Sequence, residues 1–330
     1  MSVNTLVKDG LLTKLDVETK ILEINAEIGE VHYNPGLARD PNGTVFISIR
    51  SCITNYLEKF GITHPLGYEN FLHVGILDED TLEIKDLKLI KAKKEYLGFQ
   101  WGIEDIRLFW REDGLHGIGV IIPVEGGQYK LRLAEILIDH EAGTFTLLKD
   151  FGRPFGHAEK NWSPTEQPND VFDFIYSPTQ IYKDGVVIGE DNDLFIHNGT
   201  ILLPYEDVYI SIGHAVVSVL GERTYAQIAL KWGKDGTLLE HSQFFHFNVG
   251  WREQLKETIE FASGLLWSKG KEGEELIIGL GVKDELTGIC KVPIDLLKWS
   301  PYSDTTWYAW RWDETPSRVE LPSTHYNSKP

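Results

Sequence analysis

The segment AEILIDHEAGTFTLLKDF, residues 134–151, holds two apolar runs on either side of an Asp-His-Glu-Ala-Gly turn. Such runs around turn residues are typical of a β-hairpin. The same design, with a second run that opens on Thr and an apolar residue, recurs in VGILDEDTLEIKDLKLI (74–90) and IALKWGKDGTLLEHSQFF (228–245). A hairpin that repeats along a chain predicts a β-propeller, because each blade is a four-stranded sheet and its outer hairpin repeats most visibly.

Other strand candidates are short runs rich in Val, Ile, Phe, Tyr and Trp between Gly, Asp, Asn and Pro residues, whereas helical periodicity is scarce. The clear candidates are residues 44–50, 71–78, 106–110, 116–124, 131–139, 171–177, 226–232 and 275–282. We therefore expect an all-β protein.

Polar segments also repeat, and each precedes or opens an expected innermost strand. They begin near Asn34, Glu104, Lys160, His214 and Glu260. Five starts at blade-like spacing predict a single five-bladed β-propeller domain spanning residues 1–330. The blades are expected at roughly 31–97, 98–153, 154–204, 205–250 and 257–300, with residues 307–322 closing or covering the ring. Innermost strands crowd around the axis of a propeller, so we expect these segments to converge on one central pocket.

Composition excludes several classes of function. The chain has 330 residues, 42% of them hydrophobic, and a net charge of −18 from 32 Lys and Arg against 50 Asp and Glu. Nucleic acid is not an expected partner, since its binding depends on clustered basic residues. No apolar run approaches the roughly 20 residues that cross a bilayer, and the N-terminus lacks a signal-peptide pattern. We expect a soluble cytoplasmic protein with no membrane partner.

The two cysteines indicate neither disulfides nor a metal site. Cys52 and Cys290 are too few for a disulfide framework, and neither belongs to a CxxC pair. Ligand spacing is absent elsewhere as well, so we expect no metal.

The segment GIEDIRLFWREDG (102–114) places charge inside an apolar strand. Side chains alternate in a strand, which predicts Asp105 and Arg107 on one face and Glu104 on the other. The polar residues of all the segments together form a mixed acidic and basic set that suits a small carbohydrate substrate. The set comprises Asn34, Arg50, Glu104, Asp105, Arg107, Lys160, Asn161, His214, Glu260 and Asp284.

These motifs resemble glycoside hydrolase family 130, the five-bladed propellers that include β-mannoside phosphorylases and β-1,2-mannosidases. NPGLARDPNGTVFISIR (34–50) resembles the family's Asn-Pro start that ends in Arg, and GIEDIRLFWREDG its Glu-Asp-Pro-Arg motif followed by Asp-Gly. EKNWSP, LIIGLGVKDE and GHAVVSVLGERTY resemble its Lys-Asn segment, its late Gly-x-x-Asp strand and a fourth-blade pattern of divergent relatives. The resemblance covers about residues 31–296.

The resemblance implies roles for individual residues. Asp105 would be the general acid, which passes its proton through a sugar hydroxyl while phosphate attacks the anomeric carbon from the opposite face, with inversion. Arg50 and Lys160 match positions that contact phosphate, Arg107 matches the motif Arg, and Asp284 matches an Asp at the sugar-binding end. His214 and Tyr225 come from the fourth-blade pattern and would line the sugar site with Asn34, Asn161 and Trp162. No cofactor is implied beyond inorganic phosphate as a co-substrate.

Two departures leave the acceptor open. Ile106 replaces the motif Pro, which alters backbone rigidity more than chemistry. Tyr176 and Ser177 stand where the phosphorylases carry a His-Arg pair, so one cation for phosphate is missing. Hydrolysis therefore competes with phosphorolysis, with Glu260 or Glu104 activating water, and an inverting hydrolase needs its carboxyl groups roughly 6.5–9.5 Å apart.

Structural explanations exist for the same residues. Asp105, Arg107 and Arg50 could form ion pairs only, Lys160 could be solvated, His214 could be a core residue, and Asp284 could lie in a surface turn. Trp162 could stack on a sugar face or simply pack. The chain could thus be a non-catalytic carbohydrate-binding propeller, or a protein-interaction scaffold whose axial residues neutralise one another and whose outer face carries an apolar patch. A homo-oligomer stays open.

Overall fold

The computed structural model describes residues 12–26, 28–54, 68–93, 102–121, 124–125, 128–129, 131–152, 161–189, 196–219, 222–247, 249 and 259–303. The only helix among them is a single 3₁₀ turn, Ile294–Leu296, and all other regular elements are strands. The expectation of an all-β protein is therefore confirmed. None of the described residues forms a helix with the length and hydropathy of a membrane span.

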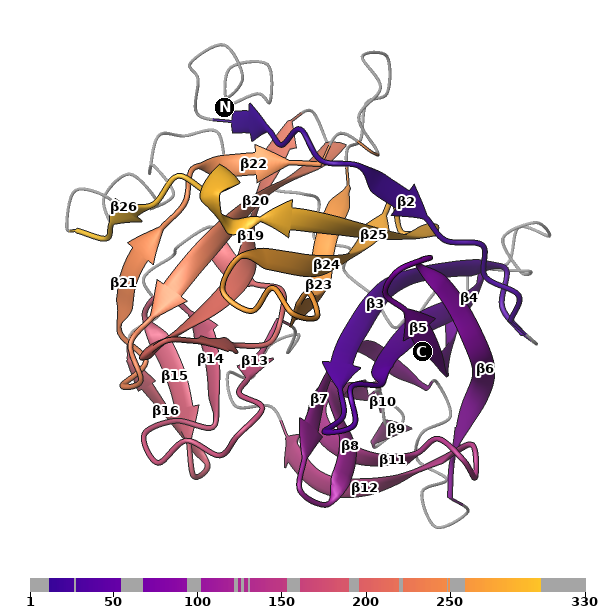
Figure 1. The fold of residues 1–330 in the computed structure, drawn as a ribbon. Helices are drawn as coiled ribbons and strands as arrows, with labels where there is room; N and C mark the ends of the chain where they lie inside the picture. The colour runs from indigo at the N-terminus through magenta and orange to yellow at the C-terminus, as the bar shows by residue number, and fades with distance from the viewer. Residues whose placement is uncertain are drawn as a thin grey trace.

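An eight-stranded sheet forms the right-hand side of Figure 1. It joins two four-stranded antiparallel groups by their outer strands, which pair in parallel (β6 with β12). The first group is β3 (Val31–Arg39), β4 (Val45–Thr54), β5 (Tyr68–Asp78) and β6 (Glu83–Ala92). The second is β7 (Ile103–Arg111), β8 (Gly114–Ile121), β11 (Arg132–Asp139) and β12 (Thr144–Gly152). A two-stranded hairpin, β9 (Val124–Glu125) and β10 (Gln128–Tyr129), lies between β8 and β11 in the chain.

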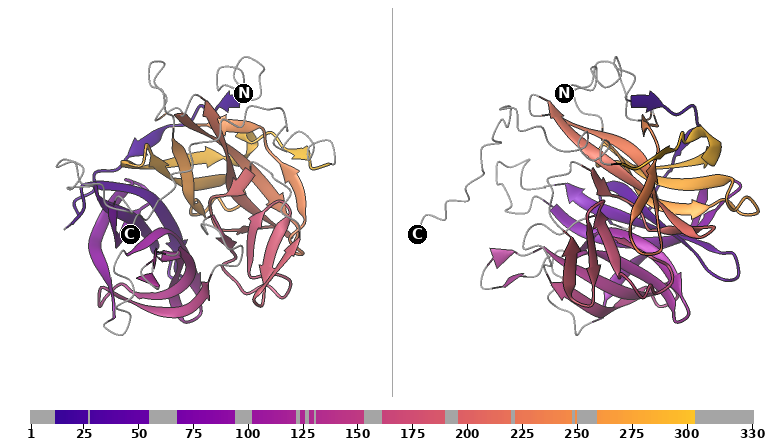
Figure 2. Two further views of the ribbon diagram at one scale, coloured as in Figure 1. Left: turned by 180° about the vertical axis from the view of Figure 1, so that it is seen from behind. Right: turned by 90° about the vertical axis from the view of Figure 1, so that its left-hand side faces the viewer.

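Three further sheets complete the fold (Figures 1 and 2). One contains β13 (Ser163–Pro164), β14 (Phe174–Ser177), β15 (Gln180–Lys183) and β16 (Val186–Gly189). The next contains β17 (Ile196–Asn198), β18 (Leu203–Tyr205), β19 (Val208–Val219), β20 (Glu222–Trp232), β21 (Leu238–His241), β22 (Phe244–His246), β26 (Ser300–Pro301) and β1 (Leu12–Lys14). The last contains β23 (Glu260–Trp267), β24 (Glu275–Val282), β25 (Leu286–Pro293) and β2 (Thr19–Ile21). These curled antiparallel sheets are those of a β-propeller, and the count of five blades stays a prediction.

The N-terminal strands join the two ends of the described chain. β1 pairs in parallel with β22, and β2 pairs antiparallel with β25, so residues near the start complete sheets formed by the last third of the chain. The sequence did not indicate β1 or β2, because each has only three residues. The predicted closing segment, residues 307–322, lies outside the described residues.

The repeated hairpins are confirmed, and one strand assignment is wrong. β5–β6, β11–β12 and β20–β21 form at the three repeated segments. His214, however, does not open a first strand: β17 and β18 pair with the same edge of β19, so His214 lies on a second strand, opposite His197. The sequence missed β17 and β18 because both are short and are separated by residues 199–202, which leave no alternating run.

The first strands of the two four-stranded groups, β3 and β7, approach one another closely. A Cβ on Gly36 of β3 would lie 2.4 Å from the carbonyl oxygen of Ile106 on β7, so only glycine fits there. Apolar side chains of different sheets also share one core cluster, in which Ile47 and Ile49 of β4 lie together with Leu266 of β23. Burial of one such side chain contributes about 1.5–3 kcal/mol to the free energy of unfolding. Hydrophobic packing therefore holds neighbouring sheets together.

A cluster of charged side chains lies around the turn between β7 and β8. His116 is buried, and its ring nitrogens lie 3.0 Å from Glu135 Oε1 and 2.7 Å from Asp113 Oδ1. Arg111 donates to the same Glu135 oxygen over 2.8 Å. Burial alone would lower the pKa of His116, but the hydrogen bonds to Glu135 and Asp113 outweigh it and raise the pKa above its usual value.

The His116 cluster predicts a pH-dependent contribution to stability. Because the folded pKa lies above the unfolded value of about 6.5, the contribution is complete below that pH and is lost as the pH rises through the folded pKa. The difference in free energy of unfolding between the wild type and His116→Gln, measured by urea denaturation, should shrink from pH 6 to pH 9. A difference that is constant over this range would contradict the assignment of a protonated imidazole.

Candidate functional site

Two β-bulges carry the central polar residues. The pairing of β3 with β4 shifts between Tyr33 and Gly36, and that of β7 with β8 shifts between Glu104 and Arg107. Within these bulges Asn34 and Asp105 adopt left-handed backbone conformations, with φ of 50° and 48°. Asn and Asp tolerate this region better than most residues, and a bulge re-aims the side chain that it contains. The bulges therefore turn both side chains toward each other.

The bulge at Asp105 makes the predicted alternation of faces wrong. Glu104 and Asp105 both contact the guanidinium of Arg50, at 3.3 Å from Nη2 to Oε1 and 2.7 Å from Nη1 to Oδ1. The left-handed residue interrupts the period of two, so neighbouring acids meet the same cation. Arg107 does not pair with the Asp105 carboxylate but donates from Nη1 to its backbone carbonyl.

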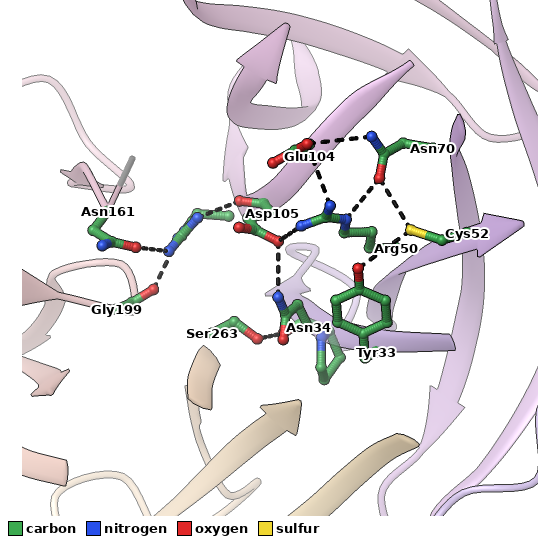
Figure 3. Close-up of polar contacts among 12 residues, drawn as sticks. Tyr33, Asn34, Arg50, Cys52, Asn70, Glu104, Asp105, Asn161, Gly199 and Ser263 are labelled. Atoms are coloured by element: carbon green, nitrogen blue, oxygen red, sulfur yellow. Dashed lines mark hydrogen bonds and ion pairs between the residues drawn. The ribbon is translucent and has the colours of Figure 1, made fainter. Parts of the chain in front are cut away.

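Arg50 is held on every side of its guanidinium (Figure 3). Its Nε donates to Asn70 Oδ1 over 2.7 Å, and Asn70 Nδ2 donates onward to Glu104 Oε1 over 3.3 Å. The ring of Tyr33 lies beneath the guanidinium, with its centroid 5.0 Å away. Burial would lower the pKa of Arg50, but Asp105 and then Glu104 outweigh it and raise the pKa well above its usual value.

Arg107 is a second buried cation in a different environment. Its Nε donates to the Gly199 carbonyl over 2.8 Å and its Nη2 to Asn161 Oδ1 over 3.2 Å, while the guanidinium lies 5.5 Å from the centre of the Phe261 ring. Within the described part of the chain it makes no ion pair. Burial lowers its pKa to about 10, with Asp105 opposing and Arg50 reinforcing the shift, so Arg107 stays charged at neutral pH.

Asn34 fixes one oxygen of Asp105. Its Nδ2 donates to Asp105 Oδ1 over 2.8 Å, so this oxygen accepts from both Asn34 and Arg50. The other end of the amide, Oδ1, is buried without a hydrogen-bond partner among the described residues. It faces Gly281 of β24, where a Cβ would lie 1.8 Å away. Gly281 therefore leaves the space in which the Asn34 amide sits.

An imidazole and aromatic cluster surrounds Phe261, the ring that contacts Arg107. His214 of β19 stacks on Tyr225 with ring centroids 5.3 Å apart and meets the edge of Phe261 at 5.0 Å. His197 of β17 lies 6.1 Å from His214. Burial, His197 and Arg107 lower the pKa of His214 well below its usual value, so its imidazole is neutral at physiological pH.

The remaining predicted residues lie in other surroundings. Trp162 is 1% exposed and packs against Phe174 and Tyr176. Glu260 is buried, and its two carboxylate oxygens accept the backbone N–H groups of Phe247 and Val249 at 2.6 and 2.8 Å. Asp284 is exposed in the turn between β24 and β25. Lys160 lies outside the described residues, directly before Asn161.

Sequence reasoning missed three residues that surround Arg50. Asn70 and Tyr33 contact it as described above, and Cys52 donates from Sγ to Asn70 Oδ1 over 3.1 Å while its sulfur lies 3.3 Å from the Tyr33 hydroxyl. The alternation of Ser48, Arg50 and Cys52 along β4 could have placed Cys52 on the face of Arg50. Asn70 belongs to no motif, and only the pairing of β4 with β5 brings it there.

The described residues contain no group of three or more His, Cys, Asp or Glu side chains arranged to hold a metal ion. The ionic groups that the structure does bring together are two guanidiniums and two carboxylates, three of them at the bulge of β7 and the fourth, Arg50, on β4. Such a set can grip hydroxyl groups and anions and can exchange a proton.

Comparison with known proteins shows the fold. No protein-family model and no curated protein sequence matches the chain. Among solved structures, a glycosyl hydrolase from Bacteroides ovatus is 11% identical with a TM-score of 0.58, over 83% of this chain and 87% of that one. A β-1,2-mannobiose phosphorylase from Listeria innocua, solved with β-1,2-mannobiose, is 14% identical with a TM-score of 0.53, over 87% and 96%. A mannose phosphorylase from Leishmania mexicana, solved with a phosphate ion, is 11% identical with a TM-score of 0.54, over 91% and 95%.

Gly281→Ala tests the packing that positions Asn34. The new Cβ would overlap Asn34 Oδ1, so either the amide leaves Asp105 or β24 moves, and we expect a loss of about 1–3 kcal/mol in the free energy of unfolding. Gly288→Ala, on the neighbouring strand β25, is the matched control, because the nearest atom to its Cβ would be the Thr19 methyl carbon at 3.3 Å, a side-chain atom that can shift. Equal urea denaturation midpoints for the two variants would contradict the tight contact at Gly281.

Proposed function

We propose that the protein is a carbohydrate-active enzyme that cleaves a mannoside-like glycosidic bond with inversion, with Asp105 as the general acid. The observation that carries the proposal is the Asp105 carboxyl group. It projects from a bulge, one of its oxygens is fixed by Asn34 and Arg50, and 5% of the residue is exposed where Glu104 beside it is 1% exposed. A positioned acid of this kind, set among cations and amides, is what glycoside cleavage requires.

Two of the solved structures of similar fold are phosphorylases that act on mannose-containing compounds, by their names, and they support the choice of substrate class. The motif resemblance at residues 34–50 and 102–114 supports the same choice. The sugar-binding residues would then be Asn34, Asn161, His214 and Tyr225, with Trp162 behind them and Asp284 at the outer end.

The reaction balances with one proton from Asp105. The Asp105 hydroxyl gives its proton to the departing glycosidic oxygen, directly or through a sugar hydroxyl, while an acceptor oxygen bonds to the anomeric carbon as the old C–O bond breaks. Phosphate needs no base, since it arrives as an anion and leaves as the sugar 1-phosphate. Water must lose a proton to a carboxylate in the same step.

The surroundings of the other carboxylates favour phosphate as the acceptor. Glu260 has both oxygens on backbone N–H groups, and Glu104 is paired with Arg50, so neither is well placed to deprotonate water. Arg50, Arg107 and Lys160 are the proposed phosphate-binding residues. Tyr176, which stands where the phosphorylases carry cations, favours hydrolysis as the alternative, for which Glu104 would have to give up its contact with Arg50 to act as the base.

A protein-interaction scaffold is the second candidate function. The ion pairs of Arg50 with both acids are the mutual neutralisation expected of such a scaffold. Val186 and Ile188, 60% and 48% exposed on strand β16 at the edge of its sheet, supply apolar surface away from these residues. A scaffold would show no turnover of carbohydrate substrates, whether Asp105 is present or substituted.

Asp105→Asn tests the proposed enzyme directly. Asparagine keeps the shape of the side chain but cannot donate an acidic proton, so turnover of the best substrate in a panel of mannosides should fall about 10²–10⁴-fold. The products, sugar 1-phosphate with phosphate present or free sugar without it, identify the acceptor. Asp80→Asn, in the exposed turn before β6, is the control and should keep wild-type turnover. Full activity of Asp105→Asn would overturn the assignment.

A further inference from the structure

We propose that binding of an oxyanion at Arg50 and protonation of Asp105 are coupled, so that the anion loads the general acid with its proton. The inference rests on the proposed function, because it concerns the same acid and the same anion site. It adds a regulatory step: without an anion, Arg50 holds Asp105 in the form that cannot act as an acid.

The contacts of Asp105 favour its ionised form. A general acid must carry a proton before the reaction, yet Oδ1 accepts hydrogen bonds from Arg50 Nη1 at 2.7 Å and from Asn34 Nδ2 at 2.8 Å. Two donors, one of them charged, stabilise a carboxylate over a carboxylic acid. The ligand-free arrangement therefore opposes the state that catalysis needs.

Arg50 is the group through which an anion could reverse this preference. Its Nε is engaged by Asn70 and its Nη2 by Glu104, and these partners are 2% and 1% exposed. Nη1 faces Asp105, the more exposed of the two acids. An oxyanion that competes for Arg50 therefore does so on the Asp105 side, and it replaces the carboxylate as the partner of Nη1.

Of the other titratable groups around Asp105, Arg107 supports the binding of an anion there. Arg107, on the same strand, is a buried cation with no ion pair in the described part of the chain. Tyr33 of β3 is un-ionised, because burial raises its pKa far above its usual range. His214 of β19 is neutral and feels the charges of both Arg107 and Asp105. Glu104 keeps its own contact with Arg50, and Lys160 lies outside the described residues.

The coupling follows from linkage and balances in protons. If the anion raises the proton affinity of Asp105 by some factor, protonation raises the affinity for the anion by the same factor. The proton comes from solvent and is held on the Asp105 carboxyl group, which keeps the hydrogen bond from Asn34. It passes to the departing sugar oxygen, and the carboxylate then pairs with Arg50 again. An anion that is bound but not consumed would activate hydrolysis in the same way.

Sulfate is the probe of choice, because its charge is constant between pH 5 and pH 8. No glycosidic substrate is added, so the titration measures only binding and proton uptake. Titration calorimetry of the full chain in two buffers of different ionisation enthalpy gives the protons taken up per sulfate. We expect net uptake approaching one proton, with the dissociation constant rising by up to tenfold per pH unit as the pH increases.

Two isosteric variants identify the group that takes up the proton. Asp105→Asn should bind sulfate without proton uptake and with a flat pH dependence, whereas Glu104→Gln should keep the uptake. Uptake that persists in Asp105→Asn would place the proton on another group, such as the neutral imidazole of His214, and would overturn the proposal.

The outcomes separate this inference from the proposed function. Sulfate binding without proton uptake in the wild type would overturn the coupling and leave phosphorolysis intact. A wild type that binds neither sulfate nor phosphate would overturn both the coupling and the phosphate site. Mannoside cleavage would then have to proceed by hydrolysis without an anion at Arg50.

Discussion

The buried guanidinium of Arg50 is the interaction on which the site depends. It joins three strands, because its partners Asn70, Glu104 and Asp105 come from β5 and β7 while it projects from β4. Removing one partner of a buried ion pair leaves an uncompensated charge and costs about 3–5 kcal/mol, so the cluster fixes how the first two groups of strands meet. In the proposed reaction the same interaction also sets the protonation state of Asp105, which would link the architecture to the chemistry.

The residues around this cluster form two groups, one charged and one mainly aromatic. Toward β3, β4 and β5 lie carboxylates, amides and Arg50, and Arg107 forms the boundary through its contacts with Asn161 and Gly199. Toward β19 and β23 lie the neutral imidazole of His214 and the aromatic rings of Tyr225 and Phe261. A sugar offers hydroxyl groups on its rim and apolar C–H surfaces on its faces, so one ring can satisfy both groups at once.

The sequence predicted the fold class, the three repeated hairpins and most of the residues that gather near Asp105. Hairpins could be predicted because alternation and turn chemistry are local. The meeting of Glu104 and Asp105 on one cation could not, since it requires a bulge that breaks the alternation on which the prediction relied. Asn70 and the short strands β17 and β18 were not predicted for a related reason. Their positions depend on pairing with other strands and not on any local sequence pattern.

The central claim is that Arg50 and Asp105 form a ligand site and are not merely buried ion pairs. A crystal structure of the Asp105→Asn variant, grown with a mannose disaccharide and phosphate, tests it most directly. The account predicts that the side chain of residue 105 lies within about 3.2 Å of a sugar oxygen, either the glycosidic oxygen or a hydroxyl group next to it, with phosphate against Arg50. A disaccharide bound elsewhere, with Arg50 still engaged by residues 104 and 105 as in the ligand-free protein, would contradict it.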